Sequence, residues 1–221
     1  MDMANDNEIW GFLSHPNKDF EKVLQVGNLI VLESESGRFY IDKDGIVQRF
    51  EPTEDNPFVD DDSDYTVTKV HKAIHTLIVP KGVKGFVSDF MRGVRVTERF
   101  ELPEGLISIG NNSFDIGDGV HCVFADCILP TVIIPQNVKV VGNFAFGHTR
   151  IETLQLPASL HSPYGRQFKD SHIETLRLPK AWKNMVSVDK DGFLKATDAL
   201  YSEDFGYLRW PSTHVERLEL Y

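Results

Sequence analysis

A short apolar segment that ends in proline recurs through the C-terminal two-thirds of the chain. Five such prolines follow one another at intervals of 23, 32, 22 and 22 residues, and a sixth segment ends at Tyr221. A unit of this length is too small to bury its own apolar side, so successive units must stack to form a core. The spacing therefore predicts a mainly β repeat solenoid. The six segments are residues 74–80, 97–103, 129–135, 151–157, 173–179 and 215–221.

Aromatic side chains support the same register, because one follows each of the first four prolines by ten or eleven residues. We expect each unit to contain a short strand, a turn and an irregular or short helical return leg. Apolar side chains at the first, fourth and sixth places of each strand should form one core with the aromatics. The interval of 32 fits a unit with inserted residues around Asp115–Val123. The aromatics are Phe90, Phe114, Phe146 and Phe168.

The stretches Ile109–Phe114 and Val141–Phe146 resemble the middle part of the leucine-rich repeat of the BspA-like family. The resemblance extends over about residues 70–221 and implies a leucine-rich-repeat solenoid of α/β-horseshoe-like form. Relatives in that family are mainly bacterial and protist proteins, often at the cell surface and engaged in adhesion. Residues 186–211 resemble the hairpin insert that such proteins often carry. The small residue before the next strand is matched by Cys127, Thr149 and Ser171.

The N-terminal third, residues 1–68, shows no repeat. We interpret it as a small α+β cap over the first unit of the solenoid at residues 69–221, because a solenoid otherwise exposes an apolar end. A separate small module with its own partner is the alternative. The stretch Glu51–Asp64 is expected to be an exposed connection. The predicted elements are a short helix within Asn17–Leu24 and strands at Asn28–Glu35, Phe39–Asp42 and Ile46–Phe50.

Composition limits the classes of partner. The formal net charge of −10 and the pI of about 5.2 disfavour nucleic acid and anionic membrane surfaces as partners. No apolar run approaches the length of about 20 residues that a membrane helix needs. The start of the chain, Met1–Asp6, lacks the features of a signal peptide, so the expected location is cytoplasmic. A cell-surface or secreted location is expected if the sequence is a trimmed form.

Two groups of residues invite a metal site, and neither fits well. His121, Cys122 and Cys127 supply too few ligands for zinc, so buried thiols are the preferred interpretation, with pairing of the two cysteines left open. The acidic run Asp60–Asp64 lacks the glycine and glutamate that a calcium loop requires at fixed positions. No nucleophile or phosphate-loop motif is present. We therefore expect a protein that is not an enzyme and has no cofactor.

The third and fifth places of each strand should point away from the core and align into two stripes. Their mixture of charged, polar and aliphatic residues suits a protein or peptide ligand, although an ordinary solvated sheet face would look the same. A homodimer through the unpaired C-terminal edge is a secondary expectation. The predicted partner-binding residues are Arg99, Glu101, Thr131, Ile133, Thr153, Gln155, Thr175 and Arg177.

The sequence thus predicts a non-catalytic scaffold for protein–protein interaction, with adhesion or cell-surface recognition implied by the resemblance. The alternative from another class is a hydrolase or small-ligand-binding protein. Its site would lie between the N-terminal segment and the first repeats. A deep polar cleft beside residues 28–75 would favour that alternative.

Overall fold

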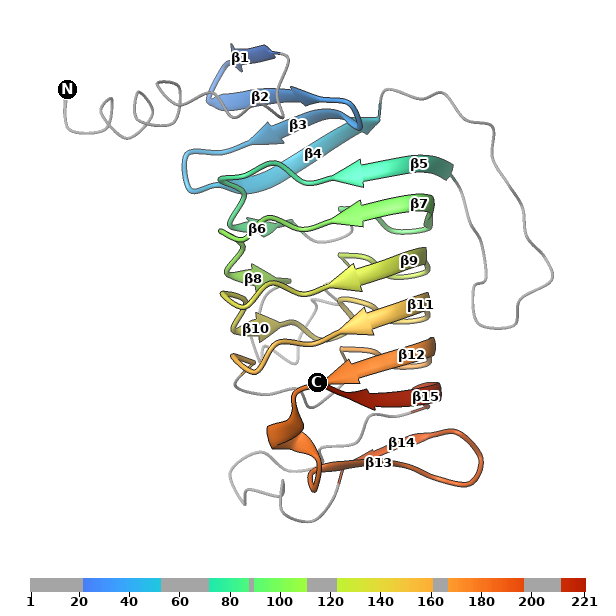
Figure 1. Ribbon diagram of the computed structural model, residues 1–221. Helices are drawn as coiled ribbons and strands as arrows, with labels where there is room; N and C mark the ends of the chain where they lie inside the picture. The colour runs from blue at the N-terminus through green and yellow to red at the C-terminus, as the bar shows by residue number, and fades with distance from the viewer. Residues whose placement is uncertain (1–21, 53–71, 88–89, 111–122, 161–166, 197–211) are drawn as a thin grey trace, which may run out of the picture.

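The computed structural model describes residues 22–52, 72–87, 90–110, 123–160, 167–196 and 212–221. In these residues the regular secondary structure is almost entirely β, and the one described helix is the short 3-10 helix η1 (Lys180–Trp182). Strands stack along one axis, with the N-terminal strands at one end and the C-terminal strands at the other (Figure 1).

The main sheet has six parallel strands, one from each of the six repeated segments. Residues one repeat apart lie side by side, as in the pairing of Leu129 with Ile151 and of Ile151 with Ile173. The predicted in-register stacking of the segments is therefore observed. From one edge to the other the strands are β15 (His214–Leu220), β12 (His172–Leu178), β11 (Arg150–Gln155), β9 (Ile128–Ile133), β7 (Val94–Glu101) and β5 (Lys72–Ile78).

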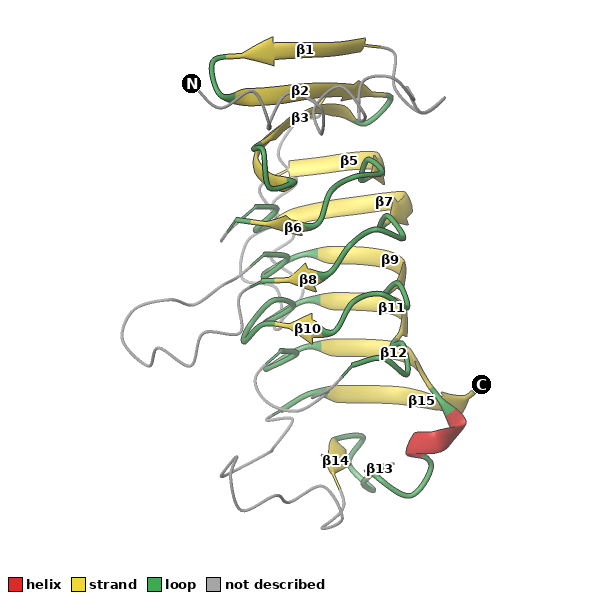
Figure 2. Cartoon of the chain, turned by 90° about the vertical axis from the view of Figure 1, so that its left-hand side faces the viewer, coloured by secondary structure: helices red, strands yellow, loops and turns green. Residues whose placement is uncertain are grey.

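The return legs lie behind this sheet and carry the two-residue strands β6 (Gly85–Phe86), β8 (Ser108–Ile109) and β10 (Val140–Val141) (Figure 2). Strands β8 and β10 pair in parallel. The described parts of the legs are irregular, which is one of the two predicted forms, and contain turns, these strands and, after β12, the 3-10 helix η1.

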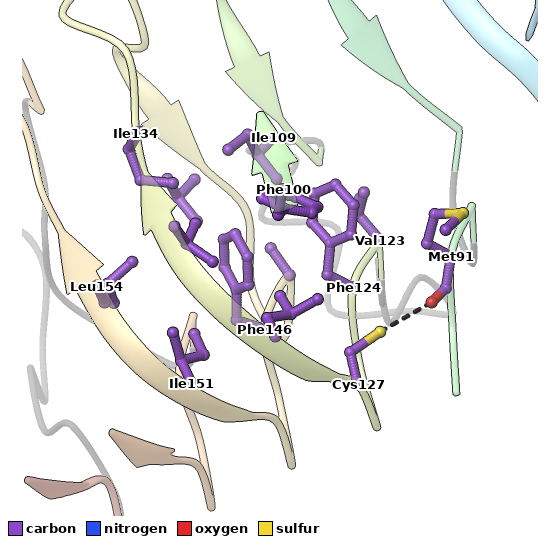
Figure 3. Close-up of a cluster of buried hydrophobic side chains, with 14 of the residues drawn as sticks. Met91, Phe100, Ile109, Val123, Phe124, Cys127, Ile134, Phe146, Ile151 and Leu154 are labelled. Atoms are coloured by element: carbon purple, nitrogen blue, oxygen red, sulfur yellow. Dashed lines mark hydrogen bonds between the residues drawn. The ribbon is translucent and has the colours of Figure 1, made fainter. Parts of the chain in front are cut away.

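The core lies between the main sheet and the return legs. The first, fourth and sixth places of β11 and its following turn, Ile151, Leu154 and Leu156, are fully buried as predicted. Phe146 stacks between Phe124 and Phe168, with ring centroids 5.3 Å apart on each side. Figure 3 shows the rings of Phe124 and Phe146 facing the apolar side chains of the sheet. Stacking one aromatic per coil therefore joins neighbouring units into one core.

Two predicted core positions are shifted by one residue, although Phe90 also packs against the core. Strand β7 contains a register shift relative to β5, so that Val96 pairs with Ile74 and is buried, whereas Thr97 is exposed. The extra residue of a bulge moves the following side chains to the other face. Met91 takes the position expected for Phe90, because its N–H donates to the next coil as that of Phe124 does. Phe114 lies outside the described residues.

A ladder of small polar side chains joins the coils at one corner. Each donates a hydrogen bond to a main-chain carbonyl of the preceding coil, and all four are buried. The residue before each of them has a positive φ, between 55° and 60°. The repeated small residue therefore satisfies a buried carbonyl that would otherwise lack a partner. The donors and carbonyls are Cys127 to Met91 (2.8 Å), Thr149 to Phe124 (2.7 Å), Ser171 to Phe146 (2.5 Å) and Thr213 to Phe168 (2.6 Å).

The N-terminal strands form a second sheet, antiparallel except where β4 pairs with β6. The three strands predicted after residue 27 are confirmed. The predicted helix is wrong where it can be checked, because Val23 and Leu24 lie in a strand that pairs with β2, while residues 17–21 lie outside the described residues. Local helical spacing was overridden by pairing with a neighbouring strand. The strands are β1 (Lys22–Val26), β2 (Leu29–Ser34), β3 (Gly37–Ile41) and β4 (Ile46–Pro52).

This sheet shares its core with the first coils of the main sheet. Phe39 packs on Phe50 with ring centroids 4.5 Å apart, and Phe50 is 6.1 Å from Phe90. In the turn between β2 and β3, the Ser36 hydroxyl accepts a hydrogen bond from the Ile78 N–H at 2.9 Å. The end of β5 is therefore held by the N-terminal sheet.

The C-terminal end carries the predicted hairpin. Strands β13 (Val186–Val188) and β14 (Leu194–Ala196) are antiparallel. The Asp189 carboxylate accepts from the N–H groups of Asp191 and Phe193, and Gly192 has a φ of 85°. These contacts form the turn between β13 and β14, and residues 197–211 of the predicted insert lie outside the described residues.

Candidate functional site

The outer face of the main sheet carries the eight predicted partner-binding residues. Strand pairing aligns Thr131 with Thr153 and Thr175, and Ile133 with Gln155 and Arg177, as the third-place and fifth-place stripes require. On β7, Arg99 and Glu101 pair with the corresponding residues of β5. Both stripes are therefore aligned within β9, β11 and β12 and, separately, within β5 and β7.

The exposure of these residues decreases along the sheet. Arg99, Glu101, Thr131 and Ile133 are exposed, whereas Thr153, Gln155 and Arg177 are half-buried. Thr175 retains only 4% of its exposure, because the Arg217 guanidinium covers it and donates to its hydroxyl at 2.8 Å. Thr175 is thus not accessible to a partner while Arg217 stays in place.

Ion pairs between neighbouring strands account for the coverage of the C-terminal half. Arg177 pairs with Glu219 at 2.9 Å, and Arg150 pairs with Glu174 at 3.3 Å. Glu219 is also 3.3 Å from Arg217. The cations and carboxylates on this half of the face are therefore largely paired with one another.

The N-terminal half is hollowed instead. A groove of about 510 Å³ lies across the carboxyl ends of β5, β7 and β9, where each strand runs into its proline. Ser34, at the end of β2, forms part of its wall and brings the N-terminal sheet to the site. We name it the β5–β9 groove. Its lining residues are Ser34, Ile78–Lys81, Glu98–Glu104, Thr131, Ile133 and Pro135.

The repeated prolines build one wall of the β5–β9 groove. Pro80, Pro103 and Pro135 end successive strands and are buried. Proline has no N–H to donate, so this wall offers few hydrogen-bond donors. Beside it lies Ile133, which is 52% exposed and is one of few large apolar side chains exposed in the described chain. An exposed apolar side chain in a concave site is a usual feature of a binding surface.

Charged side chains surround this apolar surface. Arg99 pairs with Glu101 at 2.6 Å, and its guanidinium also lies 4.0 Å from Glu35. Glu98 lies 3.7 Å from His75 Nδ1. Sequence reasoning missed Glu98 and two further charged lining residues, Lys81 and Glu104. Lys81 and Glu104 directly follow two of the repeated prolines, and this position is the signal in the sequence that could have identified them.

The β5–β9 groove has features of both functional alternatives. It contains four residues predicted for the scaffold face, Arg99, Glu101, Thr131 and Ile133, and it adjoins the N-terminal segment as the alternative requires. It lies across the ends of three strands. Its described lining includes no histidine or cysteine.

Cys127 is a buried structural thiol. Its side chain is fully buried, and its Sγ donates to the Met91 carbonyl (Figure 3). Burial, the largest effect, raises the pKa of this thiol to about 12. Among the described residues, no three histidine, cysteine or acidic side chains gather to hold a metal ion. His121, Cys122 and Asp60–Asp64 lie outside the described residues.

The Cys127 thiol should therefore be inert in the folded protein. In a Cys122→Ser background, we expect 4,4′-dithiodipyridine to label Cys127 at pH 7.5 only after urea unfolds the chain. The raised pKa also predicts that the native state loses stability as the pH rises from about 9 towards 12, since only the unfolded thiol ionises in that interval. Rapid stoichiometric labelling of the native protein would contradict this assignment.

The C-terminal edge of the sheet is formed by β15, which pairs with β12 on one side. On its other side, the start of β15 forms a bridge from His214 to Phe193 in the hairpin. The Tyr221 hydroxyl donates to the Leu156 carbonyl. Dimerisation through this edge stays a prediction.

Comparison with known proteins identifies one family. Residues 120–197 match the family model described as BspA type leucine rich repeat region (6 copies). Comparison with curated proteins and with solved structures gave no match. None of the described helices has the length and apolar character to cross a membrane.

Proposed function

Residues 120–197 are a leucine-rich-repeat region of the BspA type, and from this premise we propose that the protein is a non-catalytic scaffold that binds another protein. Repeat proteins of this kind commonly present an extended face to a partner, and leucine-rich repeats are typically non-catalytic. In this proposal the stacked coils form a solenoid, the N-terminal sheet is its cap, and the partner contacts the β5–β9 groove. Adhesion or cell-surface recognition is the setting that the resemblance to BspA-like proteins suggests.

The observation that carries the proposal is the position of the groove on the predicted face. Ile133 is exposed there beside half-exposed polar side chains, whereas charged residues on the C-terminal half of the same face are paired with one another. Interfaces usually place an apolar centre within a polar rim, and the β5–β9 groove has this composition. An open groove also favours an extended protein segment over a small molecule, which is usually enclosed on most sides.

A matched pair of isoleucines tests the proposal. Ile133 is 52% exposed in the groove, and Ile107 is 50% exposed on a return leg, outside the groove lining. The wild-type chain, Ile133→Asp and Ile107→Asp would each be immobilised, and proteins captured from the source cells and their surroundings would be quantified by mass spectrometry. We expect Ile133→Asp to lower capture of the partner about tenfold or more, because a carboxylate would be buried against an apolar surface.

The Ile107→Asp variant should capture the partner as the wild type does. Circular dichroism of both variants would verify that each is folded. Equal capture by wild type and Ile133→Asp would show that the partner binds elsewhere and would reject the groove as its site.

A further inference from the structure

The size of the β5–β9 groove limits what enters it. The groove crosses three neighbouring strands, which span about 10 Å at a spacing of about 4.8 Å. An extended chain covers this distance with about three residues. A short extended segment of a partner, running across the strands, therefore fits the groove better than a folded domain face does.

The floor of the groove favours an aliphatic side chain. Ile78 and Ile133 are supplied by β5 and β9, and Leu102 follows the last residue of β7, the strand between them. Ile78 and Leu102 are half-buried, so that each still presents apolar surface. The buried proline wall adds surface without N–H donors. Burial of one aliphatic side chain against this floor gives a central contact from which water is excluded.

The charge of the rim favours a cation beside that contact. The lining includes three carboxylates, Glu98, Glu101 and Glu104, and two cations, Lys81 and Arg99. Glu101 is already neutralised by Arg99. The Glu104 side chain is exposed and has no ion-pair partner among the described residues. The whole chain carries a net charge of −10, which adds a long-range attraction for a basic segment.

We propose that the β5–β9 groove binds a short extended segment of a partner protein in which an aliphatic side chain lies next to a lysine or arginine. The aliphatic side chain packs on Ile78, Leu102 and Ile133, and the cation pairs with Glu104. This inference rests on the proposed scaffold function and names the chemistry of the partner at the same site.

Selection from a phage-displayed library of random 12-residue peptides tests the inference on the full chain. We expect the enriched peptides to carry lysine or arginine within a few residues of leucine, isoleucine or valine. One enriched peptide would be synthesised with a fluorescent label, together with a copy in which the basic residue is replaced by glutamate. Binding would be measured by fluorescence anisotropy to wild type, Glu104→Lys and Glu152→Lys, the last being an exposed carboxylate of the same sheet outside the groove lining.

Exchanging the charges of residue 104 and of the basic peptide residue tests whether the two form an ion pair. Glu104→Lys should lower the affinity for the basic peptide by about twofold to tenfold, the usual effect of losing an exposed charge pair. The same substitution should restore binding of the glutamate peptide. Glu152→Lys should lower the affinity for the basic peptide less and should not restore binding of the glutamate peptide. Enrichment of acidic or uncharged peptides, or equal effects of both substitutions, would overturn the assignment of a basic ligand.

Failure of the inference and of the proposed function give different results. Peptides that lose binding with Ile133→Asp but are not basic would reject the ligand chemistry and support the groove as a binding site. Peptides that bind Ile133→Asp as well as wild type, or the absence of any enriched peptide, would reject both.

Discussion

Replacing Phe146 with alanine is expected to lower the free energy of unfolding by about 3–5 kcal/mol. The Phe146 ring is fully buried and lies between the rings of Phe124 and Phe168, 5.3 Å from each. Its removal leaves a cavity that two neighbouring coils must share, and it breaks contacts on both sides of one repeat. Chemical denaturation followed by circular dichroism measures the change.

The control for this substitution is Phe193→Ala. Phe193 is 37% exposed and contacts His214 edge-on at the hairpin, so it contributes little to the core. We expect a loss of about 1 kcal/mol or less for this variant, as for most surface substitutions. A Phe146→Ala variant as stable as Phe193→Ala would show that the aromatic stack does not hold the coils together.

Replacing Gly37 with alanine is expected to cost at least about 2 kcal/mol. Gly37 has a φ of 141° and pairs with Pro52 across β3 and β4. A Cβ at this position would overlap the Glu51 carbonyl oxygen and would lie 2.7 Å from the Pro52 Cα, both of which belong to backbone. Neither atom can move away as a flexible side chain could, so the N-terminal sheet must distort.

The distortion should also reach the groove. Ser36 precedes Gly37 and accepts the Ile78 N–H, and Ile78 lines the groove. Hydrogen–deuterium exchange of the peptide that contains Ile78 should therefore become faster in Gly37→Ala. Gly105→Ala is the control, because a Cβ there meets nothing within 4 Å, and we expect a change within about 0.5 kcal/mol. Unchanged stability and exchange in Gly37→Ala would show that the N-terminal sheet does not support the first coils.

Much of the candidate site was predictable from periodicity, but its shape was not. The stripes that contain Thr131 and Ile133 followed from the period of 22 residues. Burial of Thr175 did not follow, because the period aligns Arg217 with Thr175 but does not determine whether the Arg217 side chain lies over it. The groove itself also escaped prediction, since its wall includes Ser34 from a segment with no repeat.

The sequence by itself determined the repeated strand, its register and its buried face, because a fixed period of apolar residues and prolines can be satisfied together only by stacking in register. The turns at Asp42–Gly45 and Asp189–Gly192 are also locally encoded, because each ends in a glycine at positive φ. Only the tertiary structure decided the bulge in β7, the strand at Lys22–Val26 and the β5–β9 groove. Each of these depends on which distant segment packs beside a residue, and local patterns carry no information about that neighbour.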